Sequence, residues 1–278
     1  MADNYGDLTE KCREIRYQMM DMIGHLGVGH VGGSLSVVET MVLLYYKHMR
    51  NIDPANPKKA GRDRFILSKG HAGPTLYTIL ADKGYFPRDM LYTLNQGGTS
   101  LPSHPDMNRT PGIDMTTGSL GQGLSCAVGV AAGAKLKKDG ARVYSILGDG
   151  ESQEGQIWEA AMYAAQLKLD NLIAFTDYNN MQIDGTIDQI NDVAPLDKKW
   201  EAFGWNTQVV DGHNLEQIDK AIEVALKVAG QPCMIILKTT KGKGVSFIEA
   251  AGTGNHNMPV PADKRNQALE ELRGGGEK

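Results

Sequence analysis

The second half of the chain alternates between short apolar runs and segments whose apolar residues recur at helical spacing. A short continuous apolar run is typical of a parallel strand covered on both faces, and an i, i+3, i+4 recurrence is typical of a helix with one buried face. The predicted strands span residues 142–147, 171–177, 206–210 and 233–239. The predicted helices between them span about 155–167, 195–203 and 215–229. This order predicts repeated β-α-β units and therefore a parallel sheet.

The first half of the chain carries mostly helical patterns. Helices are predicted from residue 9 to about 26, from 36 to about 49, from just after 71 to about 84, and within 121–134. A strand is predicted at 64–68, and the Gly-, Pro-, Ser- and Asn-rich segment 95–111 predicts a long surface loop. Together the patterns predict one α/β domain over residues 1–278, with a doubly wound, mostly parallel sheet and helices on both faces. We expect residues 265–278 to form a polar, mobile tail.

The composition argues against several classes of function. The formal net charge is −4, the sequence pI is about 6.0, and Lys and Arg form no dense cluster, so we expect no nucleic-acid partner. No stretch approaches the ~20 apolar residues of a membrane span, and the charged N-terminus lacks the apolar core of a signal peptide. The three cysteines lie far apart, which fits unpaired thiols in a reducing compartment. We therefore expect a cytoplasmic protein with no membrane partner.

An acid between two glycines follows one of the predicted strands. Asp149 and its two flanking glycines follow the apolar run at 143–147, and Asn179 and Asn180 follow the next predicted strand, with one helix between the two strands. Adjacent parallel strands end at the same edge of a sheet, so we expect the Asp149 carboxylate to lie beside an Asn amide oxygen. Such hard oxygen ligands suit Mg2+ or Ca2+, and the residues alone do not distinguish the two ions.

These residues belong to a longer series of motifs. Gly-Asp-Gly followed, after one helix and one strand, by Asn-Asn resembles the shared motif of thiamine diphosphate enzymes. The full series is GHVGGSLS (29–36), LSKGHA (67–72), LPSHPD (101–106), TTGSLGQGLS (116–125), GDGESQEG (148–155), DYNNMQIDG (177–185) and KGKGVSF (241–247). In this order and spacing the chain resembles the transketolase family from residue 10 to about residue 260.

The resemblance implies a cofactor site for thiamine diphosphate and a divalent cation. Asp149, Asn179 and the main-chain carbonyl of Met181 would hold the cation, together with the cofactor diphosphate. The resemblance also implies a set of residues in the cofactor site: His71, Gly118, Leu120, Gly150, Asn179, Ile183 and Glu159. Of these, Glu159 would lie near a subunit contact that links paired sites.

The same resemblance implies a set of catalytic residues. His30, His104 and His256 would face the reacting carbon and the substrate hydroxyls, and Glu154 would lie near the subunit contact. Imidazoles titrate in the range that proton transfer to and from sugar oxygens requires. His256 is followed by Asn257 where the family has Gly, and Ser119 stands where the family often has Pro.

Other charged residues are given a structural role. Glu151 is expected to contribute only a favourable negative charge at the start of a helix. His25, His48 and His213 lack a motif context, so we expect them to be structural.

The resemblance covers only one part of a fused transketolase. The domain that binds the aminopyrimidine ring has no counterpart in this sequence. We therefore expect the diphosphate-binding subunit of a split transketolase, inactive without a partner subunit that carries the pyrimidine-binding domain, in a heterotetramer with two copies of each chain. The resemblance implies a transferase of carbohydrate metabolism, of the kind found in the pentose phosphate reactions. It would move a two-carbon ketol unit from a ketose or ketose phosphate to an aldose or aldose phosphate.

Three alternatives stay open. One is the α subunit of a 2-oxoacid dehydrogenase or decarboxylase, although the set of His30, His71 and His104 favours sugar chemistry. Another is a homologue that has lost catalysis, which Asp149, Asn179 and Glu154 argue against. The third is a transketolase-like enzyme for a specialised sugar, including one with an anion other than phosphate at its far end.

Overall fold

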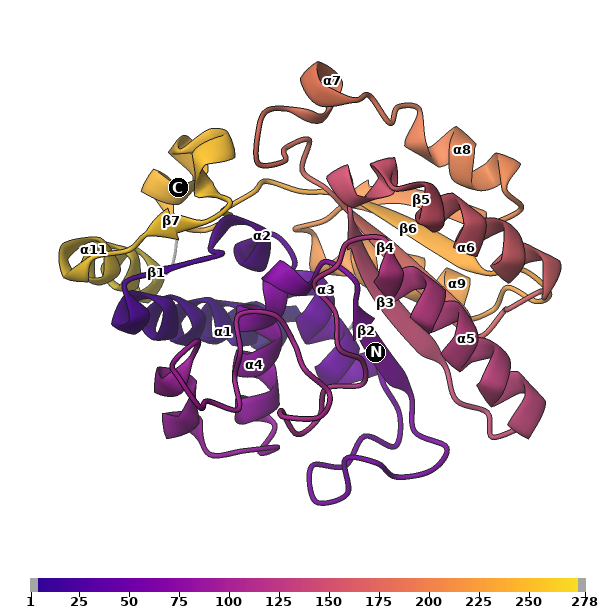
Figure 1. Ribbon diagram of the computed structural model, residues 1–278, viewed down its shortest axis with the longest axis horizontal. Coiled ribbons are helices and arrows are strands. Elements are labelled where there is room, and N and C mark those ends of the chain that lie inside the picture. Colours follow the sequence, from indigo (N-terminus) through magenta and orange to yellow (C-terminus); the bar gives the residue numbers. More distant parts are fainter. Residues whose placement is uncertain (1–4, 275–278) are drawn as a thin grey trace.

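Five parallel strands form the central sheet of the computed structural model, which describes residues 5–274 (Figure 1). The strand order is β2-β3-β4-β6-β5. The strands are β2 (Arg64–Leu67), β3 (Val143–Gly148), β4 (Leu172–Tyr178), β5 (Asn206–Asp211) and β6 (Cys233–Lys238). The register pairs Gly148 of β3 with Asp177 of β4, so these two strands end at the same edge of the sheet.

Helices cover both faces of the sheet. One face packs against α1 (Tyr5–Leu26), α3 (Val38–Leu43), α4 (Gly73–Asp82) and α9 (Leu215–Ala225), and the other against α5 (Gln122–Lys137), α6 (Gly155–Gln166) and α8 (Leu196–Ala202). In β3, Tyr144 and Ile146 belong to the first core, and Val143 and Leu147 belong to the second. Because both faces of the strand are buried, its sequence is mostly apolar, and its one hydroxyl before Gly148, apart from the Tyr144 phenol, is that of Ser145, which donates to the Ile66 carbonyl at 3.0 Å. The predicted doubly wound α/β fold is confirmed.

Short elements complete the edge of the sheet where β3 and β4 end. They are α2 (Gly32–Leu35), α7 (Ile187–Ile190), α10 (Ser246–Ala250) and the antiparallel pair β1 (Val28–Gly29) and β7 (Met258–Pro259). In that pair Gly29 lies opposite Met258, which brings His30 beside the segment that carries His256. Two-residue strands are too short to show a periodic pattern, so the sequence did not predict them.

The predicted mobile tail at 265–278 is wrong over most of its length. Residues 262–273 form helix α11 (Ala262–Arg273), which packs against α1 and buries Leu269 and Leu272. Burial of one apolar stripe stabilises such a helix although its other face is polar. Residues 275–278 lie outside the described part of the chain. Between residues 5 and 274, no helix is both long and apolar enough to cross a lipid bilayer.

Candidate active site

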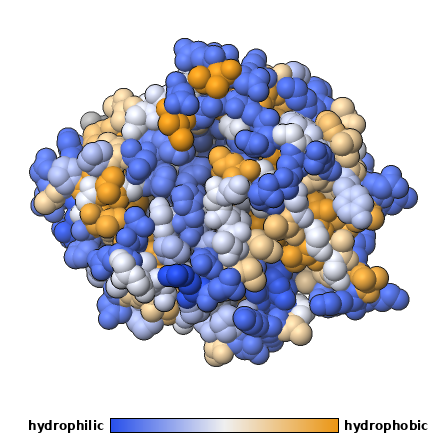
Figure 2. All heavy atoms as spheres, in the orientation of Figure 1, coloured by the Kyte–Doolittle hydropathy of each residue, from blue (hydrophilic) through white to orange (hydrophobic). Residues whose placement is uncertain are grey.

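A cavity of about 210 Å³ lies at the carboxyl ends of β3 and β4. In Figure 2 it is a hollow near the upper centre, bordered mostly by hydrophilic residues. Many of the residues predicted to form a site line it: His71, Leu120, Asp149, Gly150, Glu154, Asn179, Met181, Ile183 and His256. Open α/β sheets bind their ligands at this position. The cavity is therefore the candidate active site.

The loops after β3 and β4 are joined at the floor of this cavity. Asp149 Oδ2 accepts a hydrogen bond of 2.6 Å from the backbone N–H of Asn180, and Oδ1 accepts one of 2.8 Å from that of Gly150. Asn179 Oδ1 accepts a hydrogen bond of 3.1 Å from the N–H of Met181. The structure thus brings together the two strand ends that the spacing of the motifs placed side by side.

The oxygen atoms at this end of the cavity fit a divalent cation. Burial raises the pKa of Asp149 to about 7, and the nearby negative charge of Asp177 adds to this effect. A bound cation would favour the ionised form of such a carboxylate. Together with the Asn179 amide and the Met181 carbonyl, Asp149 offers three hard oxygen ligands, which suit Mg2+ or Ca2+. Residues 5–274 contain no group of three or more His, Cys, Asp or Glu side chains that could hold a metal ion, and this set has one carboxylate, with an amide and a main-chain carbonyl as its other two ligands.

Gly150 leaves space that a larger residue would fill. A Cβ atom at this position would lie 3.2 Å from Cβ of Gln182. Glycine therefore lets the backbone beside Asp149 pack this closely against Gln182, and it places no side chain in the cavity that Gly150 lines.

A buried ion pair lies beside the Asp149–Asn179 end, and the sequence motifs assigned it no role. Lys69 and Asp177 contact each other directly, and their side chains are 2% and 0% exposed. Asp177 also accepts hydrogen bonds from Ser36 Oγ at 2.6 Å, from Asn179 Nδ2 at 3.1 Å, and from the Thr239 hydroxyl. Burial alone would raise the pKa of Asp177, but Lys69 holds it below its usual range. The sequence signal for this pair is Asp177 itself: an acid at the end of a strand that is buried on both faces requires a buried partner.

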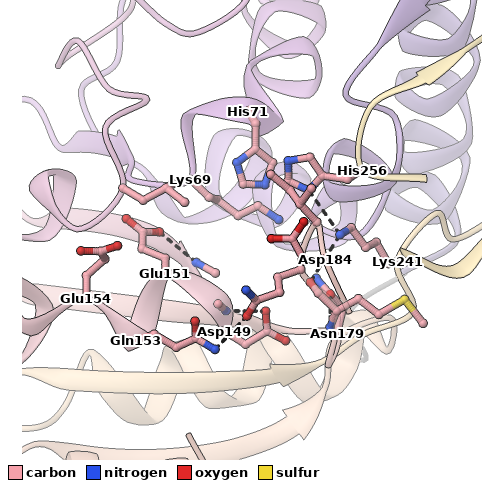
Figure 3. Close-up of a pocket in the computed structure, with 16 residues that line it drawn as sticks. Lys69, His71, Asp149, Glu151, Gln153, Glu154, Asn179, Asp184, Lys241 and His256 are labelled. Carbon is pink, nitrogen blue, oxygen red and sulfur yellow. Dashed lines mark hydrogen bonds between the residues drawn. The ribbon is translucent and has the colours of Figure 1, made fainter. Parts of the chain in front are cut away.

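Lys241 is a second buried cation, which lies within one of the motifs but was not singled out from the sequence. It is 3% exposed, and its Nζ lies 3.3 Å from the Met181 carbonyl oxygen and 3.4 Å from His256 Nδ1. Burial and the charge of Lys69 lower the pKa of Lys241 to about 8. Figure 3 shows the ammonium groups of Lys69 and Lys241 on the same side of the cavity as the histidines, with Asp149 on the other side. The arrangement favours an anionic ligand between the cations and the oxygen ligands.

Four histidines from separate segments meet at one side of the cavity. The ring centroid of His30 lies 5.4 Å from that of His104 and 5.4 Å from that of His256, and the rings of His71 and His256 are 4.8 Å apart. Figure 3 shows these last two rings side by side. His256 therefore belongs to the cluster, although Asn257 replaces the glycine that the family has after it.

The environment of the four histidines favours their neutral forms. Burial lowers the pKa of His30 and His104, and it lowers that of His71 well below its ordinary value. Burial and the positive charge of Lys241 lower the pKa of His256 to about 3. Neutral imidazoles can each accept one hydrogen bond and donate another, which suits contact with sugar hydroxyls.

The loop before α5 has a glycine against the histidine cluster. Gly118 has a φ of +137°, and a Cβ atom there would lie 3.0 Å from Cδ2 of His104. Both facts restrict this position to glycine. Two residues later in this loop, Leu120 is 38% exposed and lines the mouth of the cavity.

The expectation that Glu151 acts only on the helix dipole is wrong. Its side chain is 2% exposed and accepts hydrogen bonds from the Ser68 hydroxyl, from the Gly121 N–H at 2.9 Å and from the Gly148 N–H at 3.0 Å. Burial raises the pKa of Glu151, and these three donors oppose the shift. Glu151 thus connects the ends of β2 and β3 to the loop before α5. Its position two residues after Asp149 resembles that of an ordinary acid at a helix start, so its local pattern carries no signal of burial.

The predicted residues at the rim are exposed. Ile183 is 64% exposed, and Glu154 is exposed while lining the cavity. Glu159 is exposed on α6 and does not line the cavity. Apart from Glu159, the predicted residues that do not line it are His30, His104 and Gly118, which lie in or against the histidine cluster.

Comparison with known proteins gives a family match over nearly the whole chain. The family described as transketolase, thiamine diphosphate binding domain, matches residues 9–273. The 6-deoxy-6-sulfo-D-fructose transketolase subunit SqwG of Clostridium sp. strain MSTE9 is 54% identical over 276 residues, which are 99% of this chain and 100% of that protein. One of the subunits of the apulose-4-phosphate transketolase of Actinobacillus succinogenes is 40% identical over 97% of both chains.

Solved structures agree with this match. The transketolase of Campylobacter jejuni superposes with a TM-score of 0.89 at 32% identity, over 98% of this chain and 43% of that one. The chain thus spans less than half the length of that transketolase, whereas it spans the full length of the first of the two subunits named above. The chain belongs to the transketolase family of transferases and is its thiamine diphosphate-binding domain, in the form that two-subunit transketolases carry as one subunit.

Proposed function

We propose that this chain is the diphosphate-binding subunit of a two-subunit transketolase, which moves a two-carbon ketol unit from a ketose to an aldose with thiamine diphosphate and Mg2+. One observation carries the proposal. The cavity sets the oxygen ligands around Asp149 opposite Lys69, Lys241 and a cluster of four histidines. The oxygen ligands and the two lysines suit an anionic cofactor that binds through a cation. The histidine cluster suits a substrate with several hydroxyl groups.

The residues at the floor of the cavity would hold the cofactor. Asp149, Asn179 and the Met181 carbonyl would bind the cation, which we propose to be Mg2+, because proteins commonly hold Mg2+ through one or two carboxylates together with the phosphates of a ligand. His71 would contact the diphosphate, and Gly150 would allow its close approach. When bound, thiamine diphosphate supplies the electron sink for cleavage of the carbon–carbon bond beside the ketose carbonyl.

The residues at the cavity mouth would border the cofactor rings. These residues are Gly118, Leu120 and Ile183. The exposed apolar side chains of Leu120 and Ile183 support this assignment, because they offer apolar surface that a bound ring would cover.

The histidine cluster would orient the substrate and move its protons. His30 and His104 are held neutral, so either can take a proton from a substrate hydroxyl as the bond beside it breaks. The same group can return that proton when the acceptor aldose is in place. His256, with its pKa lowered to about 3, is a weak base and would instead hydrogen-bond a substrate hydroxyl. The packing of Gly118 against His104 keeps this ring oriented toward His30.

A partner subunit would complete the site. Glu154 and Glu159 are exposed beside the cavity and on α6, where we place the contact that links paired sites. We propose a partner that carries the pyrimidine-binding domain, in a heterotetramer with two copies of each chain. Cys12 and Cys233 are buried free thiols, and we place the enzyme in the cytoplasm, whose reducing conditions suit such thiols.

We propose a ketose with an anionic group at its far end as the donor. The relative that is 54% identical over its full length is named for 6-deoxy-6-sulfo-D-fructose, and the next relative is named for a sugar phosphate. Transfer of carbons 1 and 2 from a six-carbon donor leaves a four-carbon aldose that keeps the anionic group. The 6-sulfonated ketose is the first donor to test, with fructose 6-phosphate and xylulose 5-phosphate for comparison.

The test is ketol transfer by the assembled complex. The complex is supplied with thiamine diphosphate, Mg2+, one donor at a time and ribose 5-phosphate, and the shortened aldose is measured. We expect transfer from at least one anionic ketose and none from the complex with Asp149→Ala. Release of CO2 from a 2-oxoacid, with no transfer from any ketose, would instead identify a 2-oxoacid enzyme.

A further inference from the structure

A buried charged cluster lies behind the loop that carries Lys241, outside the cavity. It consists of Arg16 on α1, Glu39 on α3 and His213 between β5 and α9. Arg16 Nη2 donates to both carboxylate oxygens of Glu39, at 2.6 and 2.8 Å, and the side chains of the two residues are 8% and 9% exposed. His213 Nδ1 lies 3.3 Å from Glu39 Oε2. We call these three residues the rear cluster.

The rear cluster holds the main chain on both sides of Lys241. The backbone N–H of Thr240 donates to His213 Nε2 at 2.8 Å. Arg16 Nε donates to the carbonyl oxygen of Lys243 at 3.1 Å. Between these two contacts, Lys241 extends to the opposite side of the loop and reaches the Met181 carbonyl and His256.

The hydrogen-bond pattern defines the tautomer of His213. Nε2 accepts from Thr240, so the ring hydrogen is on Nδ1, from which it is donated to Glu39. A carboxylate that accepts from one ring nitrogen in this way fixes both the tautomer and the orientation of the other nitrogen. Arg16 in turn holds the Glu39 carboxylate in place. The rear cluster is therefore a connected chain of contacts that ends on the backbone of the Lys241 loop.

We propose that His213 is a positioning residue, which fixes the Lys241 loop from behind and thereby sets where the Lys241 ammonium and the His256 ring stand in the cavity. This inference rests on the proposed function, because it takes the ligand near Lys241 to be the cofactor diphosphate. It replaces the expectation that His213 has only a structural role.

Two substitutions separate the contacts of His213. In His213→Gln, the side-chain oxygen reaches as far as Nε2 and can still accept from Thr240. In His213→Asn, the shorter amide can still contact Glu39 but does not reach Thr240. His48→Gln is the matched control, because His48 is another buried histidine, 2.6 Å from the Asp219 carboxylate, and does not line the cavity.

The test measures the dissociation constant of thiamine diphosphate with Mg2+ in the assembled complex, by calorimetry without substrate. Loss of the Thr240 contact should weaken binding by about tenfold in His213→Asn, and by much less in His213→Gln. His48→Gln should lower the melting temperature but leave the dissociation constant unchanged. Equal dissociation constants for His213→Asn and the unchanged protein would overturn the proposal.

Hydrogen exchange of residues 239–244 gives a second readout that needs no cofactor. The proposal predicts faster exchange in His213→Asn than in His213→Gln, and equal exchange in the two variants would overturn it. If the unchanged complex bound no thiamine diphosphate, the proposed function would fail, while this exchange difference would still decide whether His213 positions the loop. A variant that lowers stability without changing either readout would show a purely structural role.

Discussion

Asp149 Oδ2 accepts a hydrogen bond of 2.6 Å from the backbone N–H of Asn180, so a side chain at the end of β3 is fixed to the main chain after β4. The contact crosses between two neighbouring parallel strands whose last pairs are in register. It brings one charged and one neutral oxygen ligand to the same floor of the cavity. The geometry of the proposed cation site is thus a direct consequence of the sheet.

Replacing Lys69 should destabilise the chain strongly. Lys69→Met would leave Asp177 buried without its cation, which costs about 3–5 kcal/mol in buried pairs. Urea unfolding of the isolated chain measures this change in the free energy of unfolding. Lys220→Met is the control, because Lys220 is 67% exposed and pairs with Glu216 on the surface, so its loss should leave the free energy of unfolding nearly unchanged. Equal changes in the free energy of unfolding for the two substitutions would show that the buried pair contributes no more to stability than the surface pair.

Replacing Glu151 should weaken the junction of the loops. In Glu151→Gln, an amide group that cannot accept would face one or more of the N–H donors of Gly121 and Gly148. We expect the free energy of unfolding to fall by about 1–3 kcal/mol, as for other unsatisfied buried groups. Glu223→Gln, at an exposed position of α9, is the control and should be close to neutral. An unchanged free energy of unfolding in Glu151→Gln would contradict the role of this carboxylate in joining the loops.

The Arg16–Glu39 pair should give a defined pH dependence of stability. Burial alone would raise the pKa of Glu39, but Arg16 and His213 hold it below 4.5. The unfolded state therefore binds the proton more tightly, so this group stabilises the fold above about pH 4.5 and loses its effect as pH falls through the lower folded-state pKa.

Comparison with Glu39→Gln isolates this contribution. At pH 7 the variant should be less stable by about 3–5 kcal/mol, because Arg16 loses its buried partner. The difference should shrink as the pH falls from 5 toward 3, measured by the free energy of unfolding in urea. A difference that stayed constant over this range would mean that Glu39 does not titrate as described.

Replacing Gly118 should impair catalysis more than stability. In Gly118→Ala the new methyl group would lie against the His104 ring, and the residue would have to keep a φ of +137°. We expect a stability loss of at least about 1 kcal/mol. Displacement of His104 should lower kcat by about ten- to a hundredfold. Gly97→Ala is the control, because Gly97 is exposed and a Cβ atom there has no neighbour within 4 Å. Similar kcat values for the two variants would argue against contact between His104 and the substrate.

The sequence predicted those parts of the fold that repeat a pattern over many residues. The apolar runs of β3, β4 and β6 and the helical spacing of α6 identified the doubly wound sheet, and the register of β3 with β4 then placed Asp149 beside Asn179. By contrast, the sequence does not predict α11 (ADKRNQALEELR), because most of its residues are polar and its buried stripe consists only of Ala268, Leu269 and Leu272. The spacing of Leu269 and Leu272 was the available signal.

The buried charges were harder to predict than the histidines. His30, His71 and His104 lie in motifs whose residue types already indicate a site. Lys69, Asp177 and Lys241 lie in motifs too, but their burial depends on partners far away in sequence. An acid such as Glu151 has the same local pattern whether it is exposed or buried, and only the tertiary arrangement of Ser68 and Gly121 decides the outcome. The role of His213 likewise depends on a contact to Thr240 across 27 residues.

The most direct test of the account is ketol transfer measured against the molar ratio of the two subunits, with thiamine diphosphate and Mg2+ present. We predict no transfer by this chain alone or by its pyrimidine-domain partner alone, and activity that rises with added partner until the two chains are equimolar. Full activity of this chain without the partner would contradict the shared site.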